Sequence, residues 1–173
     1  MLYALFIGLT ALERLVEMVV STRNARWSLE QGGVETGQGH YPYMVALHTG
    51  FLVACVLEHF LLPRSVPTPA VVTLLALALM AQGLRWWVIT TLGRQWNTRV
   101  IVIPGAPRVA RGPFTVIKHP NYVAVVLEGV VIPLLGGAWI TAVVFTVLNG
   151  WLLTVRIRCE NEALSRLEAA RVA

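Results

Sequence analysis

Long apolar runs alternate with short polar connectors along this chain. Three runs, residues 2–20, 44–62 and 70–92, approach the roughly 20 residues that a helix needs to cross the ~30 Å hydrocarbon core of a bilayer. Two further apolar segments, residues 122–135 and 139–155, are separated by a pair of glycines and predict a helical hairpin. The pattern therefore predicts five membrane helices.

The polar stretches between and after these runs complete the predicted organisation. Residues 21–43 are polar and contain several glycines, so we expect a loop or a short re-entrant segment. Residues 156–173 have one apolar face and predict a cytoplasmic helix. We expect a single domain over residues 1–173, with three spans in residues 1–92 and a loop, the hairpin and the C-terminal helix in residues 93–173.

Composition places the chain in a membrane. It is 56% hydrophobic and 13% charged, with a mean hydropathy of +0.66, whereas a soluble domain carries about 25% charged residues. The predicted fold class is thus an all-α integral membrane protein.

The distribution of charge predicts the orientation of the spans. The net charge is +5, and because the basic residues lie beside apolar runs, this charge indicates a membrane-surface bias and no nucleic-acid partner. The connector at residues 93–120 has no acidic residue and contains Arg94, Arg99, Arg108, Arg111 and Lys118. By the positive-inside rule, this connector is cytoplasmic and the N-terminus faces outward. The N-terminus lacks the basic region and cleavage site of a signal peptide, so the first span is expected to be retained.

Charged and polar side chains interrupt two of the spans. Glu13, Arg14 and Glu17 lie in the first, and Gln82 and Arg85 lie in the third. Such residues point into a helix bundle or reach toward the interface by snorkelling. Both readings, a functional group inside the bundle and an interfacial helix end, are left open by the sequence.

One face of the second span carries His48, Cys55 and His59. The two histidines are separated by about 16 Å of helix, which excludes a shared metal ion. We therefore expect packing or headgroup contacts here, and no metal site. With Cys159 as the only other cysteine, no disulfide framework is indicated.

A proline-bracketed basic segment, residues 111–122, separates the third span from the hairpin. Pro113 and Pro120 each disfavour the helical conformation in the residue before them. Irregular backbone beside membrane spans is tolerated only where protein or a water-filled cavity satisfies it. This segment is therefore a natural place for a binding site.

Four chemically useful side chains are predicted to meet at the cytoplasmic end of the hairpin. His119 and Tyr122 begin its first helix, and Arg156 and Glu160 are four residues apart on one helical face beyond its second. A cation, a carboxylate, an imidazole and a phenol at one membrane surface suit a charged cofactor that meets a lipid-like substrate. Taken singly, these residues also suit a solvated salt bridge and a helix start.

In order and spacing these residues resemble the isoprenylcysteine carboxyl methyltransferase family. Three strings in the N-terminal half, residues 13–17, 21–24 and 40–48, resemble a bacterial branch of that family that is often linked with lipid or polyketide methylation. The resemblance covers about residues 82–167. It is carried by Gly112-Pro113-Phe114, Lys118-His119-Pro120-Asn121-Tyr122 and Arg156-Ile157-Arg158-Cys159-Glu160. Two positions depart from the family pattern: Lys118 stands where arginine is usual, and Asn161 stands where a second glutamate commonly follows Glu160.

The resemblance implies a methyltransferase that uses S-adenosylmethionine in a cytoplasmic pocket capped by the C-terminal segment, while the lipid enters sideways from the bilayer. It implies that His119, Pro120 and Tyr122 hold the cofactor, and that Arg156 and Glu160 bound the reacting centre. The backbone of Gly112, Pro113 and Phe114 is expected to lie close to the cofactor. The expected location is the inner membrane of a bacterial cell.

The sequence leaves the methyl acceptor open. A carboxylate of isoprenylcysteine type is ionised at pH 7 and needs no base, so Arg156 would orient it. An enol, phenol or alcohol, as on a long-chain polyketide, benefits from a base, and Glu160 or His119 is then the candidate. The alternatives are a phospholipid N-methyltransferase, an NADPH-dependent reductase of the sterol-reductase type, which shares a His-Pro-Asn-Tyr string, and a non-catalytic scaffold. Prenylated or lipid-like substrates and membrane lipids are the expected partners, and the oligomeric state is left open.

Overall fold

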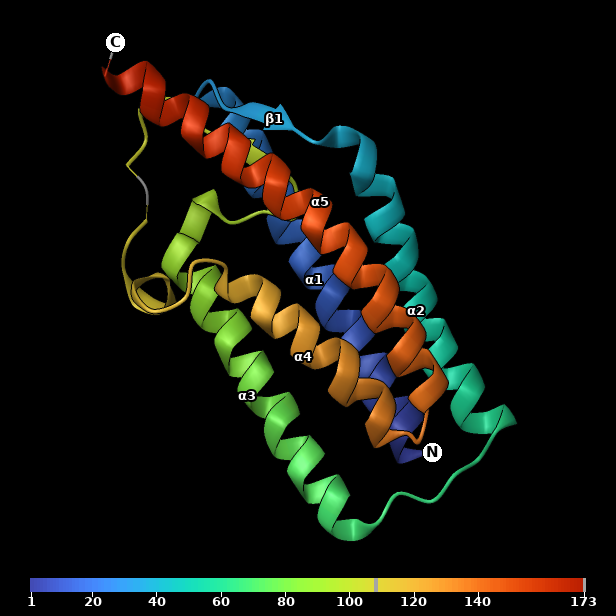
Figure 1. Cartoon of the computed structure of the whole chain (residues 1–173). Helices are drawn as coiled ribbons and strands as arrows, with labels where there is room; N and C mark the ends of the chain where they lie inside the picture. The colour runs from blue at the N-terminus through green and yellow to red at the C-terminus, as the bar shows by residue number, and fades with distance from the viewer. Residues whose placement is uncertain (108, 173) are drawn as a thin grey trace.

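The computed structural model describes residues 1–107 and 109–172, and the side chains of residues 1–107 and 109–165. Helices dominate it (Figure 1). The α-helices are α1 (Leu2–Glu30), α2 (Tyr41–Leu61), α3 (Thr68–Leu92), α4 (Pro120–Leu135) and α5 (Trp139–Val172). Shorter elements are β1 (Val34–Thr36), β2 (Val100–Val102) and the 3₁₀ helices η1 (Gln38–His40), η2 (Gly93–Gln95) and η3 (Gly112–Thr115).

Within the described residues, three helical segments are long and apolar enough to cross a membrane. They are Gln38–Leu61, Thr68–Gln95 and Trp139–Ser165, which contain α2, α3 and most of α5. α4 is apolar but shorter. The chain is therefore a helical protein with three candidate spans, and membrane crossing by α1 and α4 stays a prediction.

The prediction of a loop from residue 21 onward was wrong for its first part, because α1 continues to Glu30. Residues 21–30 contain no proline or glycine, and Ser21, Ala25 and Ser28 are buried at helical spacing. This stretch is polar, yet it has a packed face. The helix ends just before Gly32, whose φ of 79° lies in the left-handed region that favours glycine.

The predicted boundary between the last span and a separate C-terminal helix was also wrong. α5 is one uninterrupted helix from Trp139 to Val172. No proline or glycine follows Gly150, so nothing breaks the helix where the composition turns polar. Arg156 and Glu160 consequently sit on the same continuous helix as the apolar half.

A small sheet joins two connectors that are far apart in sequence. β1 and β2 pair antiparallel, with Val34 opposite Val102 and Thr36 opposite Val100. Arg99 and Glu35 form an ion pair at 3.3 Å beside it. This sheet, which the sequence did not predict, ties the polar segment after α1 to the basic connector.

The helices pack around α4, which lies between α3 and α5 (Figure 1). α4 approaches α5 closely at Gly129, because a Cβ added there would lie 2.5 Å from the Phe145 ring. Phe145 joins Ile7, Phe51, Cys55 and Ile132 in one buried apolar cluster. α4 is thereby held on both sides.

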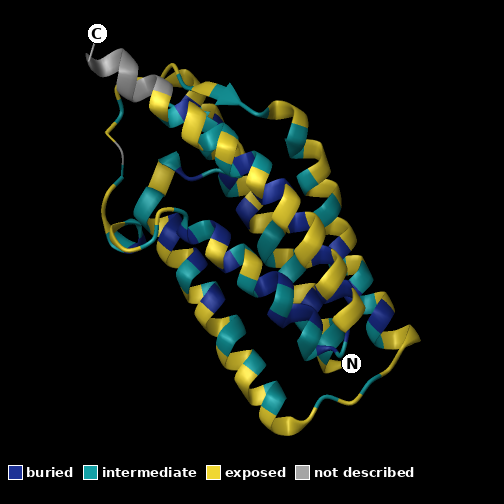
Figure 2. Ribbon diagram, viewed as in Figure 1, coloured by how far each residue is buried: buried dark blue, intermediate teal, exposed yellow. Residues whose placement is uncertain are grey.

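The outward faces of the helices are apolar. Figure 2 shows exposed residues along the outer sides of α2, α3 and α5 and buried residues where helices meet. Large hydrophobic side chains such as Leu61, Leu79 and Trp151 are more than half exposed. Apolar surface this extensive indicates contact with lipid rather than with water.

Candidate active site

The segment before α4 is held away from helix by its prolines and by one glycine. Gly112 has a φ of 59°, and a Cβ there would lie 2.7 Å from the Thr91 hydroxyl oxygen. Its neighbour Arg111 donates a hydrogen bond to the Thr91 carbonyl at 3.3 Å. Pro120 then opens α4, where its missing N–H costs nothing. The start of α4 is thus fixed against α3, and His119 precedes it.

Tyr122 is the centre of the candidate site. Its hydroxyl donates to Glu160 Oε2 at 2.5 Å and accepts from Arg156 Nε at 3.0 Å. The His119 ring is stacked on the Tyr122 ring, with centroids 5.4 Å apart, and His119 Nδ1 lies 3.7 Å from Glu160 Oε2. The structure therefore brings together the four side chains that the spacing argument placed at one end of the hairpin.

Two of the four side chains at the site are buried and two are partly exposed. Arg156 and Tyr122 are buried, whereas the side chains of His119 and Glu160 are 20% and 32% exposed. Buried ionic and hydrogen-bonding groups have strong interactions because water competes less for them. A ligand that contacts the exposed parts of His119 and Glu160 would thus meet polar groups that are already fixed in place.

Met44 contacts this site, and Asn121 precedes Tyr122 in the sequence. Arg156 Nη1 lies 3.4 Å from the sulfur of Met44 on α2. The side-chain oxygen of Asn121 is buried and has no hydrogen-bond partner within the described residues. Sequence reasoning treated Asn121 only as part of a motif string and Met44 as a span residue. Asn121 could have been found from its place between Pro120 and Tyr122, whereas nothing local marks Met44.

The other predicted cofactor-binding residues lie in two places, one next to the site and the others against α3. Pro120 is buried at the first position of α4, next to the site. Gly112 approaches Thr91 and Trp87 of α3, and Phe114 packs on the buried cluster of Val88, Ile89 and Trp96. Pro113 is buried in η3 between them. The contacts of this turn are thus with α3 and its continuation, and its closeness to a cofactor stays a prediction.

The charged residues inside the first and third spans form a buried network that also includes α4. Arg85 is buried and donates from two nitrogens to the two carboxylate oxygens of Glu128, with Nε at 2.9 Å. Arg14 donates to Glu17 at 2.8 Å, and Gln82 donates to Glu13. Of the two open readings for these residues, the structure supports side chains that point into the bundle. Glu128 was missed, although a lone carboxylate in an apolar segment is itself a signal.

Sequence comparison agrees with this geometry. The sequence profile described as the isoprenylcysteine carboxyl methyltransferase family matches residues 74–166, which run from α3 to α5 and contain every candidate site residue. The chain belongs to this methyltransferase family.

A curated relative extends the similarity over nearly the whole chain. It is the uncharacterized protein YpbQ of Bacillus subtilis (strain 168), 37% identical over 163 residues, which cover 94% of this chain and 96% of the relative. The similarity therefore includes α1 and α2, which precede the residues that match the methyltransferase family. The name of this relative carries no information about a substrate.

The two departures from the usual pattern of this methyltransferase family lie on the surface. Lys118 and Asn161 are exposed, as is the neighbouring Glu162. Glu160 is the carboxylate that contacts Tyr122. The structure thus gives no support to Glu162 as a substitute for the second family glutamate.

The cysteine and histidines on the face of α2 are packing residues, as predicted. His48 Nδ1 bonds the Met44 carbonyl oxygen at 2.8 Å, and His59 Nδ1 bonds the Gly136 carbonyl oxygen at 2.8 Å. Cys55 is fully buried. These residues stabilise the contact between α2 and the hairpin.

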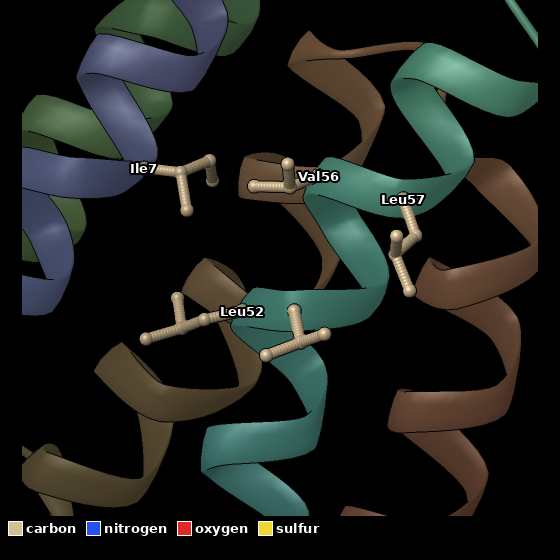
Figure 3. Close-up of a pocket in the computed structure, with 5 residues that line it drawn as sticks. Ile7, Leu52, Val56 and Leu57 are labelled. Atoms are coloured by element: carbon tan, nitrogen blue, oxygen red, sulfur yellow. The ribbon is translucent and has the colours of Figure 1, made fainter.

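A shallow apolar groove lies elsewhere, between α1 and α2. Figure 3 shows Ile7 of α1 pointing toward Leu52 and Val56 of α2. The groove has a volume of about 300 Å³, and Val53 and Leu57 complete its lining. Because all of its lining residues are aliphatic, it is suited to hydrocarbon and offers no contact for a polar cofactor.

Proposed function

We propose that the chain is a membrane-embedded, S-adenosylmethionine-dependent O-methyltransferase that acts on a lipid-like acceptor. The observation that carries this proposal is the cluster of His119, Tyr122, Arg156 and Glu160 at the open end of the α4–α5 hairpin. Membership of a methyltransferase family and the three apolar spans support it.

The residues of the cluster fit the proposed cofactor. Glu160 offers a carboxylate to the ribose hydroxyls, and Arg156 offers a guanidinium to the methionyl carboxylate. The stacked rings of His119 and Tyr122 suit a cation or an adenine ring. The side-chain oxygen of Asn121, which has no partner in the part of the chain that the structure describes, could accept a hydrogen bond from an amino group. When bound, the cofactor supplies an electrophilic methyl group on a sulfonium centre.

The chain contributes positioning and exclusion of water. Methyl transfer is an in-line displacement, which depends on alignment and on a poorly solvated nucleophile. The side chains of Tyr122 and Arg156 are buried and would keep water from one side of the reacting centre. Since these residues are on α4 and α5, which pack directly on each other, their relative position is fixed by the hairpin.

The first candidate acceptor is a carboxylate of isoprenylcysteine type, as in the name of the family. A neutral hydroxyl acceptor, such as a phenol or an enol on a long polyketide chain, is the second. One observation favours the second candidate: His119 Nδ1 lies 3.7 Å from Glu160 Oε2, so an imidazole supported by a carboxylate is placed to accept the proton of a hydroxyl.

The proposed location is a bacterial inner membrane with the reacting centre on the cytoplasmic side. The basic connector before α4 supports this orientation, because positive loops stay in the cytoplasm. Membrane lipids and a lipid-like or prenylated substrate are the proposed partners.

Radiolabelled methyl transfer tests the proposal. The detergent-purified protein is incubated with S-adenosylmethionine labelled on its methyl group, together with N-acetyl-S-farnesylcysteine or a long-chain alkylphenol. We expect label in the organic phase with at least one acceptor, and its loss in Glu160→Gln. The proposal fails if the label stays in the aqueous phase with both acceptors. If the protein also oxidises NADPH in the presence of a membrane sterol, the reductase becomes the better assignment.

A further inference from the structure

Arg156 is a buried cation without a direct carboxylate partner among the described residues. It is 7% exposed, its Nε donates to the Tyr122 hydroxyl at 3.0 Å, and its Nη1 lies 3.4 Å from the sulfur of Met44. A hydroxyl and a thioether supply no negative charge. Arg85, which is 6% exposed, is instead paired with Glu128 through two nitrogens. Because buried charges in proteins are normally paired, the surroundings of Arg156 indicate that an anion binds beside it.

The start of α2 brings a histidine to this side of Arg156. α2 and α5 pack against each other and run in opposite directions (Figure 1). Met44 of α2 contacts Arg156 of α5. One turn toward the start of α2 is His40, and one turn toward the end of α5 are Cys159 and Glu160. This antiparallel arrangement places His40 beside the turn of α5 that carries Glu160.

The packing at Gly37 supports this placement of His40. Gly37 has a φ of 69°, and a Cβ added there would lie 2.4 Å from the His40 ring and 3.4 Å from the Cβ of Cys159. The histidine ring and α5 are therefore both next to Gly37. The His40 ring is also within range of the charge of Arg156. His40 thus lies close to the buried guanidinium, although it belongs to the other half of the chain.

The ring of His40 keeps its hydrogen-bonding capacity. His48 and His59 each use Nδ1 on a backbone carbonyl oxygen, whereas the partly buried His40 makes no side-chain hydrogen bond within the described part of the chain. The backbone beside it is held in place, because the hydroxyls of Tyr41 and Thr98 are hydrogen-bonded at 3.1 Å. His40 is therefore fixed next to α5 with its ring nitrogens available to a ligand.

We propose that His40 and Arg156 together bind a carboxylate group of the ligand at the candidate site. Two groups that are both positive when protonated repel each other, and a carboxylate that lies between them removes the repulsion. Its two oxygens can accept from the imidazole and from the guanidinium at once. The assignment rests on the proposed function, and it adds to the site a residue from outside the part of the chain that matches the family.

Two ligands of the proposed reaction can carry this carboxylate. One is the methionyl part of S-adenosylmethionine, and the other is an acceptor of isoprenylcysteine type. Each source is tested by comparing a ligand with an analogue that lacks the carboxylate. The pairs are S-adenosylhomocysteine with 5′-methylthioadenosine, and N-acetyl-S-farnesylcysteine with its methyl ester. All binding is measured on the full chain in detergent.

Calorimetric binding to His40→Ala tests the cofactor as the source. We expect the wild type to bind S-adenosylhomocysteine at least about 10-fold more tightly than 5′-methylthioadenosine, because only the former has a carboxylate. His40→Ala should bind S-adenosylhomocysteine about 10-fold more weakly than the wild type, and methylthioadenosine within about twofold of it. A residue that only stabilises the start of α2 would affect both compounds alike. His59→Ala, at the other end of α2, should leave the ratio of the two affinities unchanged.

A second variant moves the imidazole without removing it. In Gly37→Ala the added methyl group meets the His40 ring, so the ring must shift, and S-adenosylhomocysteine binding should weaken by about 10-fold. Gly32→Ala is the matched control, because Gly32 has a similar φ of 79° but a Cβ there meets nothing within 4 Å. Both variants carry the strain of a left-handed alanine, and only the first should lose affinity. Binding of 5′-methylthioadenosine reports whether each variant keeps its fold.

The outcomes separate this assignment from the proposed function. A loss in His40→Ala that is confined to farnesylcysteine, relative to its methyl ester, supports the assignment with the acceptor as the source. The assignment is overturned if both carboxylate compounds bind His40→Ala within about twofold of the wild type, or if each loses affinity equally with its carboxylate-free analogue. Either result leaves the proposed function standing when the wild type binds S-adenosylhomocysteine. A wild type that binds neither adenosine compound would overturn both proposals.

Discussion

A glutamate and an arginine lie at each end of the α4–α5 hairpin, but their hydrogen bonds differ between the two ends. At the loop end, around Gly136 and Gly137, Glu58 accepts hydrogen bonds from the backbone N–H of Ile140 and Thr141 at 3.1 and 2.7 Å. Arg64 donates to Glu58 at 2.6 Å and to the Gly137 carbonyl at 2.8 Å. Glu58 thus satisfies the first turn of α5 and an adjacent cation.

At the open end, the Glu160 carboxylate and the Arg156 guanidinium do not pair directly. Glu160 and Arg156 meet through the Tyr122 hydroxyl, the carboxylate is partly exposed, and the Asn121 side-chain oxygen has no partner among the described residues. A satisfied buried carboxylate indicates a structural role, whereas a group of polar side chains with spare hydrogen-bonding capacity indicates a ligand. The comparison predicts that mutations at the two ends fail in different assays.

The largest effect is expected for Glu160→Ala. Loss of this carboxylate should lower methyl transfer by about 1,000-fold or more, because it removes both a ligand contact and the partner of Tyr122. The thermal unfolding midpoint in detergent should stay close to that of the wild type, since Glu160 is partly exposed. Full activity in this variant would remove Glu160 from the site.

Glu58→Ala should show the reverse pattern. It leaves two backbone N–H groups and the Thr141 hydroxyl without their acceptor, at a cost of about 3 kcal/mol in the free energy of unfolding. Thermal unfolding followed by circular dichroism gives this loss. Affinity for S-adenosylhomocysteine, measured below the midpoint, should match the wild type; a large loss of affinity with unchanged stability would contradict the structural role.

Gly129→Ala tests the packing that joins the two ends. The added Cβ would meet the Phe145 ring, so α4 and α5 must separate slightly, at a cost of about 1–3 kcal/mol. The same unfolding assay measures it, with Gly150→Ala as a control because a Cβ there meets open space. Equal midpoints for the two variants would mean that the close contact does not limit packing.

A smaller effect is expected for His119→Ala. The imidazole stacks on Tyr122 and borders Glu160, so its loss should weaken S-adenosylhomocysteine binding by about 10-fold. His48→Ala is the matched control on α2, where the ring serves packing. Unchanged affinity in His119→Ala would leave this histidine with a structural role alone.

The sequence predicted those parts of the molecule that have a local signal. The bounds of α2, α3 and α4 follow the apolar runs, because hydropathy reports what a helix surface contacts. Motif spacing placed His119, Tyr122, Arg156 and Glu160 at one end of the hairpin because helix geometry is regular. Their roles stay predictions.

Other features arise from contacts between elements and had no local signal. The polar half of α1 is a helix because Ser21, Ala25 and Ser28 pack inward. The pairing of Arg85 with Glu128 depends on the crossing of α3 and α4, which a single sequence does not reveal. The β1–β2 sheet depends likewise on two distant connectors.

Calorimetry of S-adenosylhomocysteine on the detergent-purified wild type, beside Arg156→Ala and with NADPH run in parallel, tests the central claim most directly. The account predicts that the homocysteine compound binds the wild type, that it binds Arg156→Ala at least about 10-fold more weakly, and that NADPH does not bind. Binding of NADPH in its place, or equal binding of S-adenosylhomocysteine by both proteins, would contradict the account.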